Sequence, residues 1–176
     1  KLPSNSTKYQ LTVIVVNYNV EYFLDQCLTS VRKAIQGLKV EVIVVDNASG
    51  DGSVELLEKK YSDLHLILNN ENVGFSKANN QGINIAQGKY VLLLNPDTIV
   101  EENSFQKVID YMDAHEDVGG LGVRMIDGKG NFLPESKRGL PKPMVAFYKI
   151  VGLSRVFPKS KQFGQYHLGH LSEFET

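Results

Sequence analysis

Four short apolar runs, rich in β-branched residues, occur in the first half of the chain. They cover residues 11–16, 40–45, 64–68 and 90–94. Apolar residues are continuous in these runs rather than alternating with polar ones. The pattern therefore predicts strands buried on both faces, which is typical of a parallel sheet.

Between these runs, apolar residues recur at the spacing of one helix face. The first set is Leu24, Leu28, Val31 and Ile35. Further helices are predicted at residues 54–61, 75–86 and 103–114. The residues expected to face inward are Phe75, Ala78, Gly82 and Ile85 in the third helix, and Phe105, Val108, Ile109 and Met112 in the fourth. We expect Ser53 to cap the second helix and Gly88 to end the third.

Strands and helices alternate with the period of a βα unit, roughly 25–30 residues. The fold class predicted is α/β, a three-layer α/β/α sandwich with a mostly parallel central sheet. After residue 115 the pattern changes. Residues 118–126 predict a strand weakened by three glycines, and residues 127–130 predict a turn from which 131–133 pair back as a hairpin.

Composition narrows the classes of function. The chain has 176 residues, of which 42% are hydrophobic, which suffices for one domain with a sizeable core. Its net charge is -1, whereas nucleic-acid binders usually carry a basic surplus, so no nucleic-acid partner is expected. The single cysteine, Cys27, permits no internal disulfide, fits a reducing compartment and is expected to be a small buried residue.

Polar residues follow three of the predicted strands. Asn17, Tyr18 and Asn19 follow the first, Asp46 and Asn47 the second, and Asn95, Pro96 and Asp97 the fourth. Ligands of open parallel sheets bind beyond the carboxyl ends of the strands, so these residues are candidates for a binding site. We expect the three strand ends to lie side by side, with Asp46 and Asp97 projecting into one shared crevice from neighbouring strands.

Asp46 has two interpretations. Its carboxylate can accept hydrogen bonds from a nucleotide base or a ribose hydroxyl. Alternatively, it caps the loop that follows it, since aspartate readily bonds its own downstream amides. Asp51, five residues later, is expected to be a cap or turn residue.

Asp97 also has two interpretations. Pro96 restricts the backbone and extends the residue before it, which presents Asn95 and Asp97 at the sheet edge. Mg²⁺ is commonly held by one or two carboxylates, with substrate phosphates and waters as the other ligands. The alternative is a plain type I turn, for which Asn-Pro-Asp is a suitable sequence.

The start of the third helix can bind an anion. Gly74 permits close approach of a ligand, helix N-termini attract anions, and Lys77 adds positive charge. The alternative is a glycine turn with asparagine capping.

The order of these motifs resembles the inverting family 2 glycosyltransferases of the GT-A fold, and most of all their rhamnosyltransferase-like branch. The resemblance covers about residues 11–135. It rests on Asn-Tyr-Asn after the first strand, Val-Val-Asp-Asn-Ala-Ser-Gly-Asp-Gly-Ser after the second, Asn-Val-Gly-Phe with Ala-Asn-Asn-Gln-Gly, and Leu-Leu-Leu-Asn-Pro-Asp-Thr.

The resemblance implies roles for particular residues. Asn17 and Tyr18 would line the nucleoside pocket, Asp46 would bond the base, and Asn80 would lie near the nucleotide. Asn95-Pro96-Asp97 would match the Asp-Xaa-Asp motif of the family. The nucleotide-sugar-binding residues predicted are Asn17, Tyr18, Asp46, Asn47, Gly74, Lys77, Asn80, Asn95 and Asp97, of which Asn95 and Asp97 would hold Mg²⁺ or Mn²⁺.

The chain departs from the family pattern at three points. Asn95 stands where the first acid of Asp-Xaa-Asp is expected, and Asn79 where many members have Arg. No residue matches the catalytic base. Asp127, Glu135, Glu173 and Glu175 are within reach but lack the apolar setting expected of a base. We therefore expect the base beyond Thr176, and the chain to be truncated before it.

The implied function is transfer of a sugar, with inversion, from a nucleoside-diphosphate sugar to a hydroxyl of a glycan or lipid-linked glycan, in the synthesis of cell-surface polysaccharide. Residues 1–10 would be a flexible lead-in, 11–135 the nucleotide-sugar-binding core, and 136–176 an incomplete segment on the acceptor side. One alternative is a donor-binding module without catalysis. Another is a phosphoacceptor signalling domain, which needs an acidic pair where this chain has Asn17 and Asn19.

Residues 144–157 mix apolar residues with lysine and arginine. We favour a helix that packs on the sheet, because most amphipathic helices cover cores. The alternative is a peripheral membrane contact. No run reaches the roughly 18–20 apolar residues of a membrane span. The expected location is cytoplasmic, with the inner face of the membrane as the site of that contact.

Overall fold

A computed structural model describes residues 7–133, 143–152, 156–157 and 160. The chain divides into two compact units, Lys1–Gly119 and Gly120–Thr176. The elements of the first unit are β1 Tyr9–Asn17, α1 Glu21–Ala34, β2 Val40–Asp46, α2 Ser53–Lys60, β3 His65–Leu68, α3 Phe75–Ile85, β4 Gly88–Leu94 and α4 Ser104–Ala114. The second unit contains α5, Pro143–Ile150.

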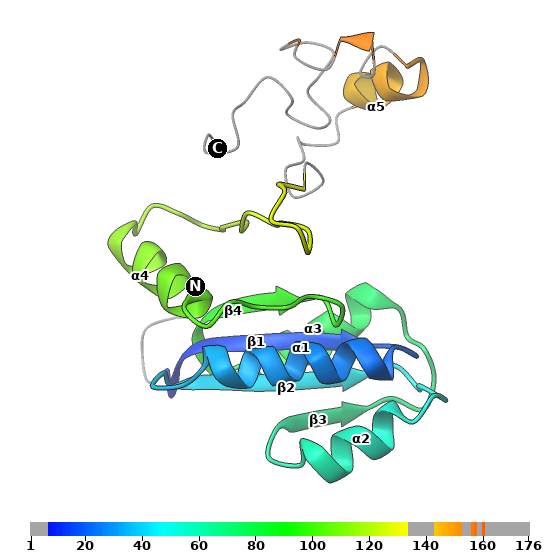
Figure 1. Ribbon diagram of the computed structural model, residues 1–176, viewed down its shortest axis with the longest axis vertical. Coiled ribbons are helices and arrows are strands. Elements are labelled where there is room, and N and C mark those ends of the chain that lie inside the picture. The colour runs from blue at the N-terminus through cyan, green and yellow to red at the C-terminus, as the bar shows by residue number, and fades with distance from the viewer. Residues whose placement is uncertain (1–6, 134–142, 153–155, 158–159, 161–176) are drawn as a thin grey trace. The chain divides into compact units, whose positions relative to one another are not determined.

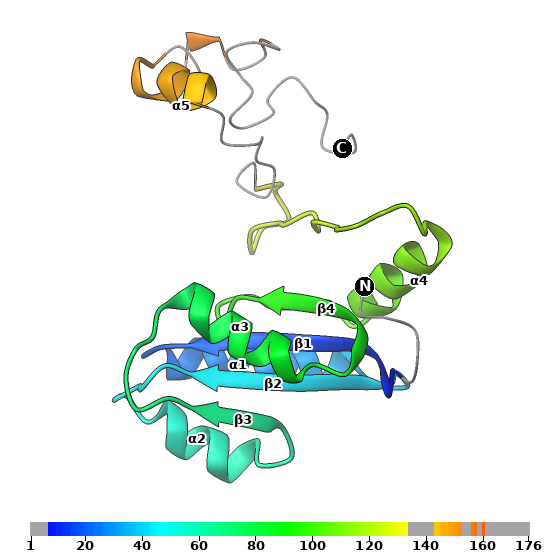
Figure 2. The same ribbon diagram turned by 180° about the vertical axis from the view of Figure 1, so that it is seen from behind.

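The four strands form one parallel sheet in the order β3-β2-β1-β4. Figure 1 shows α1 in front of this sheet, and Figure 2 shows α3 on the opposite face. Side chains from α1, α2 and α4 share a core with Val13, Val15 and Val44 on one face. Ile14 and Ile43 pack with Ala78 of α3 on the other face. The four strands predicted between residues 11 and 94 and the three-layer α/β sandwich are confirmed. Burial on both faces holds for β1 and β2 but not for β4, where Val91 and Leu93 are 37% and 48% exposed.

Helix α3 departs from its prediction at both ends. Ala78 and Gly82 are buried as expected, but Phe75 and Ile85 are 59% and 44% exposed. A Cβ atom on Gly82 would lie 2.8 Å from Ile14 Cγ2, so the middle of the helix lies directly on the sheet. Because small residues in the middle turns make this contact, the bulky residues at the two ends extend into solvent.

Two predicted helix boundaries were wrong. Gly52, with φ of 91°, precedes α2, and Ser53 is the first helical residue. The Ser53 backbone N–H and hydroxyl both donate to Asp51 Oδ1, so Asp51 holds the turn, as expected. Gly88 opens β4 instead of ending α3. A Cβ there would lie 2.5 Å from the backbone N of Thr12, so the close approach of β1 accounts for this glycine.

A buried carboxylate fixes the connection between α3 and β4. Glu41 is the second residue of β2 and is 4% exposed. Its Oε2 accepts hydrogen bonds from Thr12 Oγ1 at 2.7 Å and from the Gln87 backbone N–H at 2.9 Å. Thr12 Oγ1 in turn accepts from the Gly88 N–H at 2.9 Å. These bonds hold the start of β4 beside β1.

The strand predicted at residues 118–126 was wrong. Only the hairpin turn is confirmed: Ile126 bridges Phe132 in antiparallel fashion, and Gly130 N–H donates to the Asp127 carbonyl at 3.0 Å. The three glycines raise the entropic cost of an extended strand. In the second unit, Leu121, Val123 and Met125 are exposed. Across the described residues, no helix has the length and apolarity needed to cross a membrane.

Candidate nucleotide-binding site

The centre of the candidate site is a pair of buried polar residues at the carboxyl ends of β1 and β2. Asn17 and Asp46 are register partners, and neither is exposed. Asp46 Oδ1 accepts from Asn17 Nδ2 at 2.8 Å, and Oδ2 accepts from the Ser49 N–H at 2.8 Å. Asp46 therefore caps its own turn. A carboxylate can accept further hydrogen bonds, so its contact with a base stays a prediction.

Asn17 has one acceptor atom that the described residues leave unsatisfied. Its Nδ2 donates to Asp46 and, at 3.1 Å, to Ser49 Oγ. Its Oδ1 is buried and receives no hydrogen bond from this part of the chain. Leaving a buried acceptor unpaired typically costs about 1–3 kcal/mol. A ligand N–H or O–H could satisfy this oxygen only where neighbouring side chains shift to admit it, because the atom is closed to solvent.

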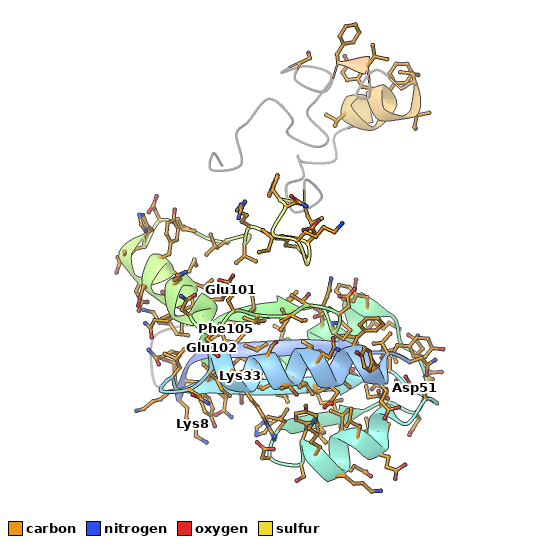
Figure 3. All side chains as sticks on the ribbon, in the orientation of Figure 1. Lys8, Lys33, Asp51, Glu101, Glu102 and Phe105 are labelled. Atoms are coloured by element: carbon orange, nitrogen blue, oxygen red, sulfur yellow. The ribbon has the colours of Figure 1, made fainter. Side chains whose placement is uncertain are left out.

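The loops after β1 and β2 are joined to each other. Ser49 Oγ accepts from the Asn19 backbone N–H at 2.9 Å, and the Gly50 N–H donates to Asn19 Oδ1 at 2.7 Å. Asn19 and Ala48 have positive φ, 54° and 62°, which marks tight turns. Figure 3 labels Asp51 at this edge of the sheet. The structural role of Ser49 was not predicted, although Ser and Asn beside a strand end are a turn signal.

Tyr18 lies at the same edge, directly after Asn17, and is 48% exposed. An exposed aromatic ring beside a buried hydrogen-bonding pair is suited to pack against a planar base. Tyr22 and Phe23, at the start of α1, are also exposed, and their rings meet edge to face.

Three amide side chains connect β2, β3 and α3. Asn47 is 2% exposed, and its Oδ1 accepts from Asn69 Nδ2 at 2.9 Å. Asn69 also exchanges two hydrogen bonds of 2.9 Å with Gln81. The predicted residue Asn47 thus has a structural contact, and its own contact with a nucleotide stays a prediction. Asn69 and Gln81 were missed, because no local pattern shows that their side chains meet.

The start of α3 matches the turn interpretation. Gly74 has φ of 84°, and its N–H donates to Asn72 Oδ1 at 2.9 Å, as in an asparagine-capped turn. Lys77 and Asn80 are exposed on the helix. No contact in the described structure brings Lys77 or Asn80 to Asp46, so their roles stay predictions.

The residues after β4 form the turn that Asn-Pro-Asp favours. The Thr98 N–H donates to the Asn95 carbonyl at 3.2 Å. Asp97 is exposed, and its carboxylate accepts no hydrogen bond from the described residues. Burial, and secondly the charge of Asp97, raise the pKa of the Cys27 thiol to about 12. No group of three or more His, Cys, Asp or Glu residues in the described ranges could hold a metal by itself.

The sheet order places Asp46 and Asp97 at the same edge but not on neighbouring strands. Asp46 ends β2 and Asp97 follows β4, and β1 lies between these two strands. Two interstrand spacings separate the axes of β2 and β4 by about 10 Å. The expectation that the two acids come from adjacent strands was wrong. The ends of β2, β1 and β4 do lie side by side, as expected.

Of the candidate bases, only Asp127 lies within the described residues. Its carboxylate accepts hydrogen bonds from the Lys129 and Asn131 backbone N–H groups and from Asn131 Nδ2. The Asn131 side chain, followed by these backbone groups, lowers the pKa of Asp127. The Asp127 carboxylate therefore stabilises its own turn. Its lowered pKa makes it poorly suited to remove a proton from an acceptor. The other three candidates, Glu135, Glu173 and Glu175, lie outside the described residues.

Comparison with known proteins identifies relatives. Minor teichoic acid biosynthesis protein GgaB of Bacillus subtilis (strain 168) is 32% identical over 132 residues, which are 70% of this chain and 15% of GgaB. Poly(ribitol-phosphate) beta-N-acetylglucosaminyltransferase TarS of Staphylococcus aureus (strain Mu50) is 28% identical over 132 residues, 72% of this chain and 23% of TarS. The chain thus spans less than a quarter of either relative.

TarS is also among the solved structures that resemble this fold. The crystal structure of S. aureus TarS 1-349 in complex with UDP matches with a TM-score of 0.59 and 27% identity, over 77% of this chain and 39% of that one. The family model described as "Glycosyl transferase family 2" matches residues 12–168. The chain therefore belongs to glycosyl transferase family 2.

Proposed function

We propose that this chain binds the donor of a glycosyltransferase that moves a sugar, with inversion, from a nucleoside-diphosphate sugar to an acceptor hydroxyl in cell-surface glycan synthesis. One observation carries the proposal. The strand ends of β2, β1 and β4 present, side by side, the buried Asn17–Asp46 pair and the exposed Asp97. Membership of family 2 supports it, as do two relatives, the teichoic acid biosynthesis protein GgaB and the poly(ribitol-phosphate) beta-N-acetylglucosaminyltransferase TarS.

The nucleoside would occupy the end of β1. Asn17 Oδ1 offers a buried acceptor to a base N–H or ribose hydroxyl, and Tyr18 offers a ring for packing. Asp46 would hold Asn17 in the orientation that leaves this oxygen free. Since the matched TarS structure contains UDP, UDP is the first nucleotide to test.

The donor set at Asn95 and Asp97 fits a divalent ion that shares its ligands with phosphate. Asp97 supplies an exposed carboxylate and Asn95 an exposed amide, while pyrophosphate oxygens and waters complete the shell of such an ion. When bound, Mg²⁺ or Mn²⁺ neutralises the charge on the departing nucleoside diphosphate. Asn95 in place of an acid reduces the local negative charge, so we expect modest metal affinity without nucleotide.

Inversion at the anomeric carbon implies that the sugar is transferred in a single displacement. The acceptor oxygen attacks the anomeric carbon, the bond from this carbon to the diphosphate oxygen breaks, and the acceptor proton passes to an acidic base. The transition state has oxocarbenium character, as in glycoside hydrolysis. In this proposal the described residues would supply the donor side of the reaction, and the base stays a prediction.

The two alternatives have different standing. Family membership argues against a phosphoacceptor domain, and Asn17 and Asn19 occupy the positions where that class needs acids. The other alternative, a donor-binding module without catalysis, must be distinguished from a transferase by experiment. It predicts UDP binding without sugar transfer by the parent protein.

Calorimetric titration of UDP in the presence of Mn²⁺ or of EDTA tests the proposal. We expect Mn²⁺ to strengthen UDP binding, and Asp97→Ala to weaken it at least tenfold, roughly the loss expected when a metal site is disturbed. Glu102→Ala, an exposed acid on the same connection to α4, is the matched control and should bind as the unmodified chain does. Equal affinity in EDTA, or unchanged affinity in Asp97→Ala, would refute the metal role.

A further inference from the structure

Charge is unevenly distributed along this nearly neutral chain. Of its 19 basic residues, seven lie in residues 136–172, and all 20 acidic residues lie outside that stretch. The seven are Lys137, Arg138, Lys142, Lys149, Arg155, Lys159 and Lys161. The rest of the chain is correspondingly acidic. A local basic surplus of this kind attracts anionic surfaces.

The same stretch exposes large apolar side chains. The described ones are Phe147, Ile150, Val151, Val156 and Phe157, with exposed fractions of 53%, 83%, 49%, 68% and 51%. We call these five residues the apolar surface of the second unit. Val145, on the same helix as Phe147 and Ile150, is buried at 4%, so α5 is not exposed on all sides. Holding such side chains in water is unfavourable, and five of them between residues 147 and 157 mark a segment suited to interaction.

We propose that the apolar surface of the second unit binds the surface of an anionic lipid membrane. The two observations together select this partner. A soluble polyanion would match the basic residues but would leave the five apolar side chains in water. A neutral apolar protein surface would cover those side chains but would not require the excess of Lys and Arg. A bilayer interface offers anionic headgroups above a hydrocarbon layer, and so satisfies both.

This binding does not depend on the proposed sugar transfer. If both hold, the membrane contact would keep the donor-binding sheet near acceptors that are anchored in lipid. The two claims are separable, because UDP binding reports on the first unit and vesicle binding on the second.

Co-sedimentation of the chain with lipid vesicles tests the proposal. We expect the chain to sediment with phosphatidylcholine–phosphatidylglycerol vesicles, to stay in solution with phosphatidylcholine alone, and to be released as salt screens the charges. The double variant Phe147→Ser/Ile150→Ser should bind the anionic vesicles at least about tenfold more weakly, because it removes two apolar groups that enter the interface.

The matched control is Ile83→Ser/Ile85→Ser, which changes two exposed isoleucines of α3 in the first unit and should sediment as the unmodified chain does. The residues changed in both variants are exposed, so the fold should survive, and retained UDP binding would verify this for the first unit. The salt series on the unmodified chain tests the electrostatic part without any substitution.

Three results would overturn the proposal. The first is no sedimentation with anionic vesicles. The second is equal binding by the Phe147→Ser/Ile150→Ser variant. The third is binding to soluble inorganic polyphosphate that competes with vesicles and is equally strong in that variant, which would identify a polyanion partner instead. Loss of UDP binding with intact vesicle binding would refute the proposed function and leave this inference standing.

Discussion

At the scale of single residues, Cys27 of α1 packs against the turn that follows β4. Its Sγ donates to the Asn95 carbonyl at 3.6 Å, so the thiol lies directly behind the residues proposed to hold the metal. Burial, and then the charge of Asp97, disfavour the thiolate and raise the pKa of the thiol from 9.0 to about 12. Cys27 is therefore a buried structural residue, as its sequence setting predicted, and unsuited to be a nucleophile.

This pKa predicts how stability depends on pH. The folded thiol holds its proton up to a higher pH than the unfolded thiol. Its contribution is therefore complete below pH 9 and is lost as pH rises from about 9 towards 12. Within that window we expect the free energy of unfolding of the unmodified chain to fall relative to Cys27→Ala by up to about 1.4 kcal/mol per pH unit.

Urea unfolding of both proteins over a pH series measures this difference. Taking the difference between the two proteins cancels the titration of tyrosines and lysines that they share. A difference that stays constant from neutral pH into the alkaline range would contradict the prediction.

At the scale of elements, hydrogen bonds between amide side chains position the loops at the site. Asn69 follows β3, and its side chain reaches both Asn47 and Gln81 of α3. Its backbone N–H also donates to the Asp46 carbonyl at 2.9 Å. The end of β2 is thereby held between β3 and α3, with Asn17 on its other side.

Asn69→Ala should loosen this arrangement. It removes three side-chain hydrogen bonds and leaves the amide groups of Asn47 and Gln81 without these partners, which we expect to cost about 1–3 kcal/mol of stability. We also expect weaker UDP binding, because Asn47 and Asp46 are adjacent. Urea unfolding and UDP titration measure the two effects.

Asn70→Ala is the control, since Asn70 is the exposed neighbour of Asn69. If Asn69→Ala and Asn70→Ala behave alike in both measurements, the amide connection does not position the site.

At the scale of the whole molecule, the candidate donor residues all lie in the first unit, which carries the parallel sheet. A ligand that binds only the folded form of this unit must stabilise it. UDP with Mn²⁺ at a hundred times the dissociation constant should contribute about 2.7 kcal/mol. For a chain of this length, that corresponds to a rise in Tm of roughly 5–10 °C.

Differential scanning calorimetry with UDP and Mn²⁺, and again with UDP and EDTA, measures this stabilisation. The rise should be largest with the metal present and should grow with the logarithm of the UDP concentration. No rise at saturating UDP, or a rise that EDTA leaves unchanged, would contradict a metal-assisted donor site in the first unit.

Local pattern predicted the positions of all four strands, but it predicted burial on both faces correctly only for β1 and β2. β1 and β2 are buried almost throughout, as continuous apolar runs predict, and their parallel pairing followed. β4, at the edge of the sheet, leaves Val91 and Leu93 exposed although its run is equally apolar. The sequence pattern gave wrong predictions where one residue type is compatible with two local structures. Glycine can end a helix or admit a neighbouring strand, and only the contact of Gly88 with Thr12 decides between them. For residues 118–126, apolar composition outweighed the glycines in the prediction, although the glycines prevent a regular strand.

The amino-acid sequence by itself determined the α/β alternation, the polar residues at three strand ends and the family resemblance, because these depend on residue type and spacing along the chain. Only the tertiary structure decided the strand order that puts β1 between Asp46 and Asp97, the bond that engages Asp46 with Asn17, and the meeting of Asn69 with Gln81. The physical reason is that hydrogen bonds between distant segments depend on which strands pair and how the helices pack. Those choices minimise the free energy of the whole chain, and no local window of sequence contains them.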